Sequence, residues 1–62
     1  MTNNDMELAI KIIRENRELY RKEGIEDKQS QLMLSIMLTG MNYTETEIRY
    51  CYVLATGKNM EV

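Results

Sequence analysis

The chain of 62 residues has no histidine and no proline, and it has one cysteine, Cys51. A single cysteine cannot form a disulfide within the chain, and without histidine none of the common zinc-ligand patterns is present. A domain of this length buries only about 60% of the surface that its unfolded chain exposes, so small domains commonly rely on a disulfide, a metal or a partner. We therefore expect association with another chain to supply part of the stability.

The sequence also lacks long apolar runs and clusters of basic residues. Residues 1–5 are polar, so no signal or transit peptide is predicted. The most apolar stretch, residues 32–41, is interrupted by polar residues and is far shorter than the roughly 20 residues that cross a bilayer. A net charge of −2 disfavours attraction to phosphate backbones. These features predict a cytoplasmic protein that binds neither membranes nor nucleic acid directly.

Residues that could catalyse a reaction are few, and each has a structural explanation. Cys51 has no histidine to serve as its base and lies on an apolar stripe, which is typical of a small core residue. Glu45 and Glu47 stand at a predicted helix start, where capping and the helix dipole explain acidic residues better than acid–base chemistry does. The sequence therefore predicts a protein that is not an enzyme and that takes no cofactor, no metal and no small-molecule ligand.

Three glycines, at positions 24, 40 and 57, divide the chain into segments with helical patterns. Each glycine follows its segment directly, where a left-handed C-terminal cap is expected. The sequence predicts an all-α fold over residues 1–62, in which a long amphipathic N-terminal helix precedes a helical hairpin. The predicted helices cover about residues 4–23, 28–39 and 44–56. Residues 58–62 have no pattern and are expected to fray.

The first predicted helix has the pattern of a surface helix. Asn4 followed by Glu7 is a variant of the capping box, and the apolar residues share one broad arc. The opposite face alternates in charge, which indicates a solvated surface. Asn16 lies inside the apolar arc, and we interpret it as a polar residue facing a gap or a turn. The alternative is a register-setting asparagine at a helix interface.

The second and third predicted helices have more apolar surface than one neighbour can cover. The second has Asp27 as its expected N-cap, and its apolar residues span about two-thirds of its circumference. The third begins with a capping box of Thr44 and Glu47 and has apolar residues on opposite sides. A second copy or a different protein is expected to cover the excess.

The candidates for this protein-binding surface are the apolar and aromatic residues of these two segments. They are Leu32, Met33, Ile36, Met37, Met41, Tyr43, Ile48, Tyr50 and Tyr52. Because so short a chain cannot bury all of them, we expect about half in its own core and about half at an intermolecular contact.

The same two segments could form a helix-turn-helix joined through residues 39–43. The start of the third predicted helix would then face the bases. Glu45 and Glu47 lie there, and the duplex would repel their carboxylates. Arg49 is the only basic residue of that helix, so direct reading of DNA is disfavoured.

Residues 27–54 carry four short motifs in a fixed order: an Asp-Lys start, Leu32-Met33, a turn ending in Asn42-Tyr43-Thr44, and Glu47-Ile48-Arg49. This stretch resembles the helical hook of the Sin-type antirepressors and of the matching oligomerisation domain in their target repressor. In that family two helices joined by a short turn interlock with the same hook of the partner, so that a small acidic protein remodels a DNA-binding repressor. Two features depart from the pattern. Glu45 stands where the family commonly has a proline, and the long first helix has no counterpart.

A second resemblance is to the ubiquitin-associated domain, whose loop and later turn are similar to residues 41–43 and 57–59. Too few residues follow for the third helix of that domain. The antirepressor resemblance implies a regulator from a bacterium or a bacteriophage that binds a transcription regulator and modulates its oligomerisation or DNA binding, and that is itself a homodimer. A self-associating structural module and an acidic inhibitor of an enzyme or nuclease remain the alternatives.

Overall fold

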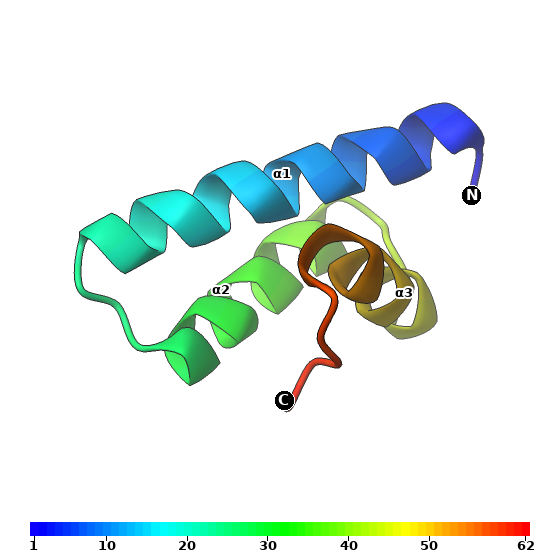
Figure 1. The fold of residues 1–62 in the computed structure, drawn as a ribbon. Coiled ribbons are helices and arrows are strands. Elements are labelled where there is room, and N and C mark those ends of the chain that lie inside the picture. Colours follow the sequence, from blue (N-terminus) through cyan, green and yellow to red (C-terminus); the bar gives the residue numbers. More distant parts are fainter.

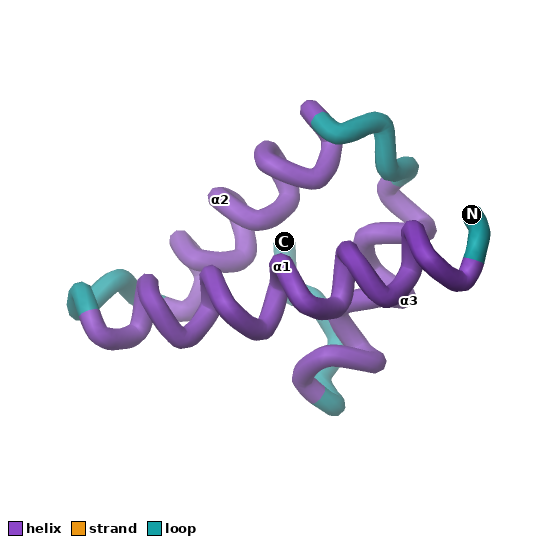
Figure 2. The backbone as a smooth tube through the Cα atoms, turned by 90° about the horizontal axis from the view of Figure 1, so that it is seen from above, coloured by secondary structure: helices purple, strands orange, loops and turns teal.

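The computed structural model describes all 62 residues and contains three α-helices and no strand. The helices are α1 (Asn3–Lys22), α2 (Asp27–Gly40) and α3 (Glu45–Thr56). Figure 1 shows α1 lying across α2 and α3, which are both on one side of it, and Figure 2, seen from above, shows α2 and α3 diverging beneath α1. The predicted all-α fold is confirmed, and each helix end lies within one residue of its predicted position.

Capping by nearby side chains sets the starts of α1 and α3. At α3 the predicted capping box is present, since the Thr44 hydroxyl accepts from the Glu47 amide at 3.2 Å and the Glu47 carboxylate accepts from the Thr44 amide at 2.8 Å. At α1 the prediction is wrong by two residues, because Thr2 and Asp5 form the box in place of Asn4 and Glu7. The Asp5 amide donates to the Thr2 hydroxyl at 3.1 Å. The two pairs have the same spacing, so sequence alone favours neither strongly.

The start of α2 has no side-chain cap. Glu26 occupies the N-cap position, and its side chain makes no hydrogen bond to the first turn. Asp27, the predicted cap, is instead the first helical residue, and its carboxylate accepts from the Gln31 amide at 2.9 Å. The N–H groups at this end of α2 are therefore left without a side-chain acceptor.

Two of the three predicted glycine caps are confirmed. Gly24 and Gly57 have φ angles of +78° and +76°, which glycine adopts without a steric penalty. Gly40 is instead the last residue of α2, and Asn42 takes the left-handed conformation two residues later, with φ of +70°. Asparagine tolerates this region better than most residues, which explains how the turn forms without a glycine there.

One hydrophobic core lies between the three helices. It consists of nine buried residues: Ala9, Ile13, Tyr20, Leu34, Leu38, Ile48, Cys51, Tyr52 and Met60. Cys51 is fully buried, as predicted, and desolvation raises the pKa of its thiol. Asn16, within α1, is half-buried, and its side-chain amide donates to the carbonyl of Ile12 in the same helix at 2.8 Å.

The C-terminal residues pack against the helices, so the expected fraying is wrong. Met60 is buried in the core. The Glu61 amide donates to the side-chain oxygen of buried Gln31 at 2.7 Å, and Arg49 donates to the carbonyl of Val62 at 2.5 Å. A buried amide side chain requires hydrogen-bond partners, and the tail supplies one that no local sequence pattern could reveal.

Candidate protein-binding surface

The outer face of α2 is apolar and exposed. Leu34 and Leu38 point into the core, and Ile36, two residues from each, lies about 160° away from both around the helix. Ile36 is 73% exposed, and Leu32, one turn earlier, is 44% exposed. Burying an aliphatic side chain of this size is worth about 1.5–3 kcal/mol relative to leaving it in water. A partner that covers this face would therefore gain binding free energy from both residues.

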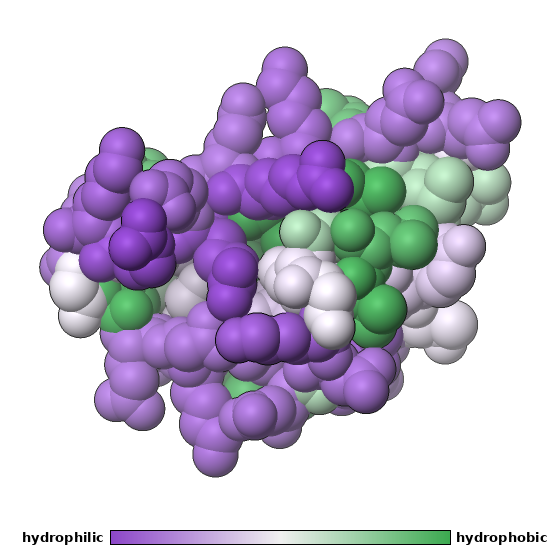
Figure 3. All heavy atoms as spheres, in the orientation of Figure 1, coloured by the Kyte–Doolittle hydropathy of each residue, from purple (hydrophilic) through white to green (hydrophobic).

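The outer side of α3 has a similar character. Ile48, Cys51 and Tyr52 face the core and Ala55 packs against it, which leaves the remaining apolar residues of this helix on its solvent side. The exposed residues are Tyr50, Val53 and Leu54. Figure 3 shows hydrophobic side chains gathered on one face of the molecule, between the first half of α1 and α3. Exposed aromatic and aliphatic groups on neighbouring elements are typical of a surface that binds another protein.

The structure divides the nine predicted binding residues into three groups. The exposed ones are Leu32, Ile36, Met41 and Tyr50, and the half-buried ones are Met33, Met37 and Tyr43. Ile48 and Tyr52, at 2% and 1% exposed, belong to the core and are removed from the surface. Some of the nine were expected in the core, but the sequence did not say which, because α3 has apolar residues on both sides and periodicity cannot say which side α1 will cover.

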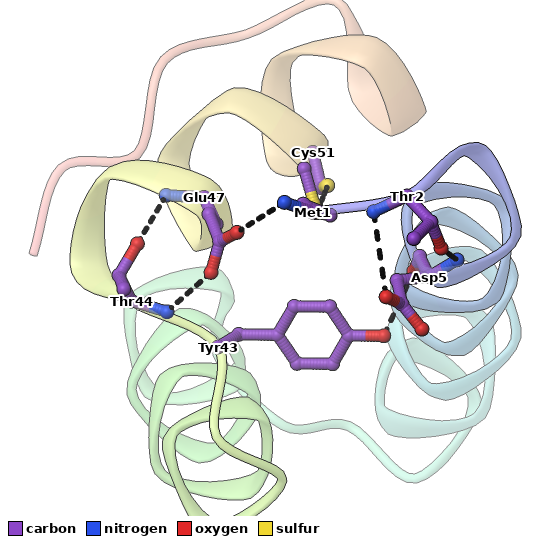
Figure 4. Close-up of polar contacts among 7 residues, drawn as sticks. All are labelled: Met1, Thr2, Asp5, Tyr43, Thr44, Glu47 and Cys51. Carbon is purple, nitrogen blue, oxygen red and sulfur yellow. Dashed lines mark hydrogen bonds and ion pairs between the residues drawn. The ribbon is translucent and has the colours of Figure 1, made fainter.

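Tyr43 has a structural role that was not predicted. Its hydroxyl donates to the carbonyl of Asp5 at 2.8 Å, which ties the turn before α3 to the first turn of α1. Figure 4 shows the ring spanning the space between these two elements. Desolvation, and then the nearby Asp5 carboxylate, raise the pKa of this phenol.

Glu47 makes a second connection at the same place. Its carboxylate accepts from the Thr44 amide and lies 3.6 Å from the terminal ammonium of Met1 (Figure 4). The hydrogen bond from the Thr44 backbone lowers the pKa of Glu47. This corner of the molecule is thus held by polar contacts, and its residues are less available to a partner than the outer face of α2.

Five exposed apolar residues were not among the predicted binding residues: Met1, Leu8, Leu19, Val53 and Leu54. Leu8 and Leu19 are eleven residues apart, close to three helical turns, so they lie on the same side of α1. Both were placed in one broad apolar arc, but they are at its edge, about 80–140° from buried Ala9 and Ile13. A narrower estimate of the buried arc would have found them.

Two hollows adjoin the exposed apolar residues. One, of about 230 Å³, lies between α2, α3 and the tail and is lined in part by Leu32, Ile48 and Met60. The other, of about 290 Å³, lies beside the turn before α3 and is lined in part by Leu8 and Met41. Both are smaller than typical sites for drug-sized ligands, and their size suits single side chains of a protein partner.

None of the three helices is both long and apolar enough to cross a membrane. No protein-family model matches the chain, and no curated protein and no solved structure matches it either.

Proposed function

We propose that this protein acts by binding another protein through the outer faces of α2 and α3, and that its partner is a transcription regulator whose oligomerisation or DNA binding it modulates. The exposure of Ile36, at 73%, carries the proposal, because a large aliphatic side chain in the middle of a helix gains most from being covered. Leu32 on the same face of α2 is also exposed, and so is Tyr50 on α3.

The class of partner follows from the resemblance of residues 27–54 to the antirepressor hook. In support, α2 and α3 are two helices joined by the short turn at residues 41–44. Their inner faces pack against α1, with Leu34, Leu38 and Cys51 buried. Docking would therefore use the outer faces, whereas an open hook presents its inner ones. The partner would be a bacterial regulator in the cytoplasm of the cell, or of the host if the protein is encoded by a bacteriophage.

Self-association is the second candidate function, because the exposed apolar residues of α2 and α3 could cover those of another copy. The same surface would then be self-complementary about a two-fold axis. A monomer in light scattering at micromolar concentration would eliminate self-association, whereas a dimer would fit both proposals. A monomer that still captures a regulator supports the first proposal alone.

The decisive experiment compares Ile36→Asp with Leu19→Asp. Both place a carboxylate at an exposed apolar position, but Leu19 lies on α1, outside the proposed surface. Affinity capture from a bacterial lysate, followed by a DNA-binding assay of the captured regulator, provides the measurement. We expect Ile36→Asp to keep its helical circular dichroism and lose the regulator, and Leu19→Asp to keep both. Capture of the same regulator by Ile36→Asp would show that α2 is not the docking face.

A further inference from the structure

A second, polar site lies between the second half of α1, the start of α2 and the end of α3. A cavity of about 240 Å³ is lined there by Arg14, Arg17 and Arg21 from α1 and by Ser30 from α2. The three arginines are spaced three and four residues apart, so they share one side of their helix. The left part of Figure 3, over the end of α1 and the start of α2, is mostly hydrophilic.

Positive charge is in excess in this cavity. The three guanidinium groups meet only two carboxylates among the lining residues, Glu18 and Asp27. Arg21 and Glu18 form two hydrogen bonds, of 3.2 and 2.7 Å, and Arg17 lies 3.7 Å from Asp27. Arg14 pairs with no carboxylate, and its only hydrogen bond is a long one of 3.4 Å to the carbonyl of Ala55. Arg14 therefore retains donors for a ligand.

Two buried donors at this cavity make no hydrogen bond within the protein. The Ser30 hydroxyl is one, in a residue only 3% exposed, and the Nε of Arg17 is the other, with the Asp27 carboxylate 3.7 Å away. Buried polar groups in folded proteins almost always have a partner. The start of α2, which has no side-chain cap, adds the positive end of a helix dipole. These observations all favour an acceptor that carries negative charge.

We infer that this cavity binds a phosphate group, either as inorganic phosphate or as the monoester of a small molecule. A tetrahedral phosphate offers acceptors in several directions, which suits guanidinium groups and a hydroxyl that come from two helices. A planar carboxylate would satisfy fewer of them. The sequence predicted no small-molecule ligand, because the alternating charges of α1 were interpreted as a solvated face and buried Ser30 was not considered.

The phosphate site is separate from the proposed protein-binding surface. Six residues separate Ser30 from Ile36, which places their side chains about 120° apart around α2 by the shorter way. Ile36 is exposed and Ser30 is buried, so a substitution at one leaves the contacts of the other in place. The phosphate inference can thus fail while the protein-binding proposal stands, and the reverse also holds.

The test titrates the full chain with inorganic phosphate and, separately, with glycerol phosphate at constant ionic strength. Binding is followed by the amide and arginine Nε signals in ¹H–¹⁵N spectra. Ser30→Ala and Arg14→Gln each remove one proposed donor, and Lys58→Gln is the control because Lys58 is exposed and lies outside the cavity. We expect saturable shifts around Arg14 and Ser30, affinities about tenfold weaker in the first two variants, and little change in the control.

Glu18→Gln sharpens the test in the opposite direction. It removes a negative charge and weakens the pair that holds Arg21, so phosphate should bind several-fold more tightly. Tighter binding of glycerol phosphate than of inorganic phosphate would assign an organic ligand, and equal binding would assign free phosphate. Shifts that never saturate, or equal affinities of Ser30→Ala and the unaltered protein, would overturn the inference.

Discussion

The two ends of α1, each with the helix that packs against it, differ in how completely their polar groups are hydrogen-bonded. Where the first turn of α1 meets the start of α3, Thr2, Asp5, Tyr43, Thr44 and Glu47 all make hydrogen bonds. Where the second half of α1 meets the start of α2, the Ser30 hydroxyl and the Arg17 Nε are buried and make no hydrogen bond. The hydrogen bonds of the first end stabilise it. The second end leaves buried polar atoms without hydrogen bonds, which costs stability, and this is where we propose that phosphate binds.

The largest loss of stability is expected from a substitution in the hydrophobic core, which lies between the two ends. Leu38 is fully buried, and its carbonyl accepts from the Tyr43 amide at 3.1 Å, close to the paired end. Leu38→Ala should lower the free energy of unfolding by about 2–5 kcal/mol through lost burial and a residual cavity. So small a domain would be largely unfolded by that loss. Urea denaturation followed by circular dichroism measures this loss. A loss below about 1 kcal/mol would mean that neighbouring side chains move in to fill the cavity at this position.

A smaller effect is expected from the cap at the paired end. Thr44→Ala removes the hydroxyl that accepts from the Glu47 amide, which should cost about 1 kcal/mol of unfolding free energy. Thr46→Ala is the matched control, because Thr46 is exposed within the first turn of α3 and makes no capping bond. Equal losses in the two variants would show that helix propensity, and not the capping box, determines the result.

The paired end should also respond to acid. The hydrogen bond from the Thr44 backbone lowers the pKa of Glu47 below its ordinary value of 4.5. A carboxylate with a depressed folded-state pKa contributes stability above its unfolded-state pKa and loses it as pH falls through the folded-state value. Thermal unfolding from pH 6 to pH 3 should therefore show less acid destabilisation in Glu47→Gln than in the unaltered protein. Identical pH profiles would assign the acid response to other carboxylates.

The smallest change in stability, and one of opposite sign, is expected at the unpaired end. Ser30→Ala removes a buried hydroxyl without a partner, so without phosphate the protein should be as stable as before or up to about 1 kcal/mol more stable. Ser35→Ala, at a half-buried serine on the same helix, controls for helix propensity. A clear loss of stability in Ser30→Ala alone, measured by urea denaturation, would show that the hydroxyl is already paired and that the two ends do not differ.

Much of the local structure could be predicted because it depends on residues within one helical turn of each other. The capping box at Thr44, the left-handed glycines at 24 and 57 and the extents of the three helices are all of this kind. The errors at Asn4 and Asp27 are local as well, because Thr2 and Glu26 compete with them for the same role. The sequence pattern could not tell which of two nearby residues would occupy the N-cap position.

The candidate sites were less predictable. Exposure of Ile36 and Leu32 agrees with the expectation of an uncovered apolar face on α2, whereas Ile48 and Tyr52 were candidates for the binding surface and lie in the core. The cavity around Ser30 had no sequence signal at all. Its lining residues come from positions 14 to 56 and meet only when the three helices pack.

By itself, the sequence determined that this chain forms three helices, where each begins and ends to within one residue, and that α2 and α3 have more apolar surface than the chain can bury. Hydrogen bonding and helical periodicity act over a few residues, so these properties are encoded locally. Only the tertiary structure decided which faces of α2 and α3 pack against α1, how the tail reaches Gln31 and which buried polar groups make no hydrogen bond. Those outcomes depend on contacts between residues far apart in the chain, whose geometry no local pattern contains.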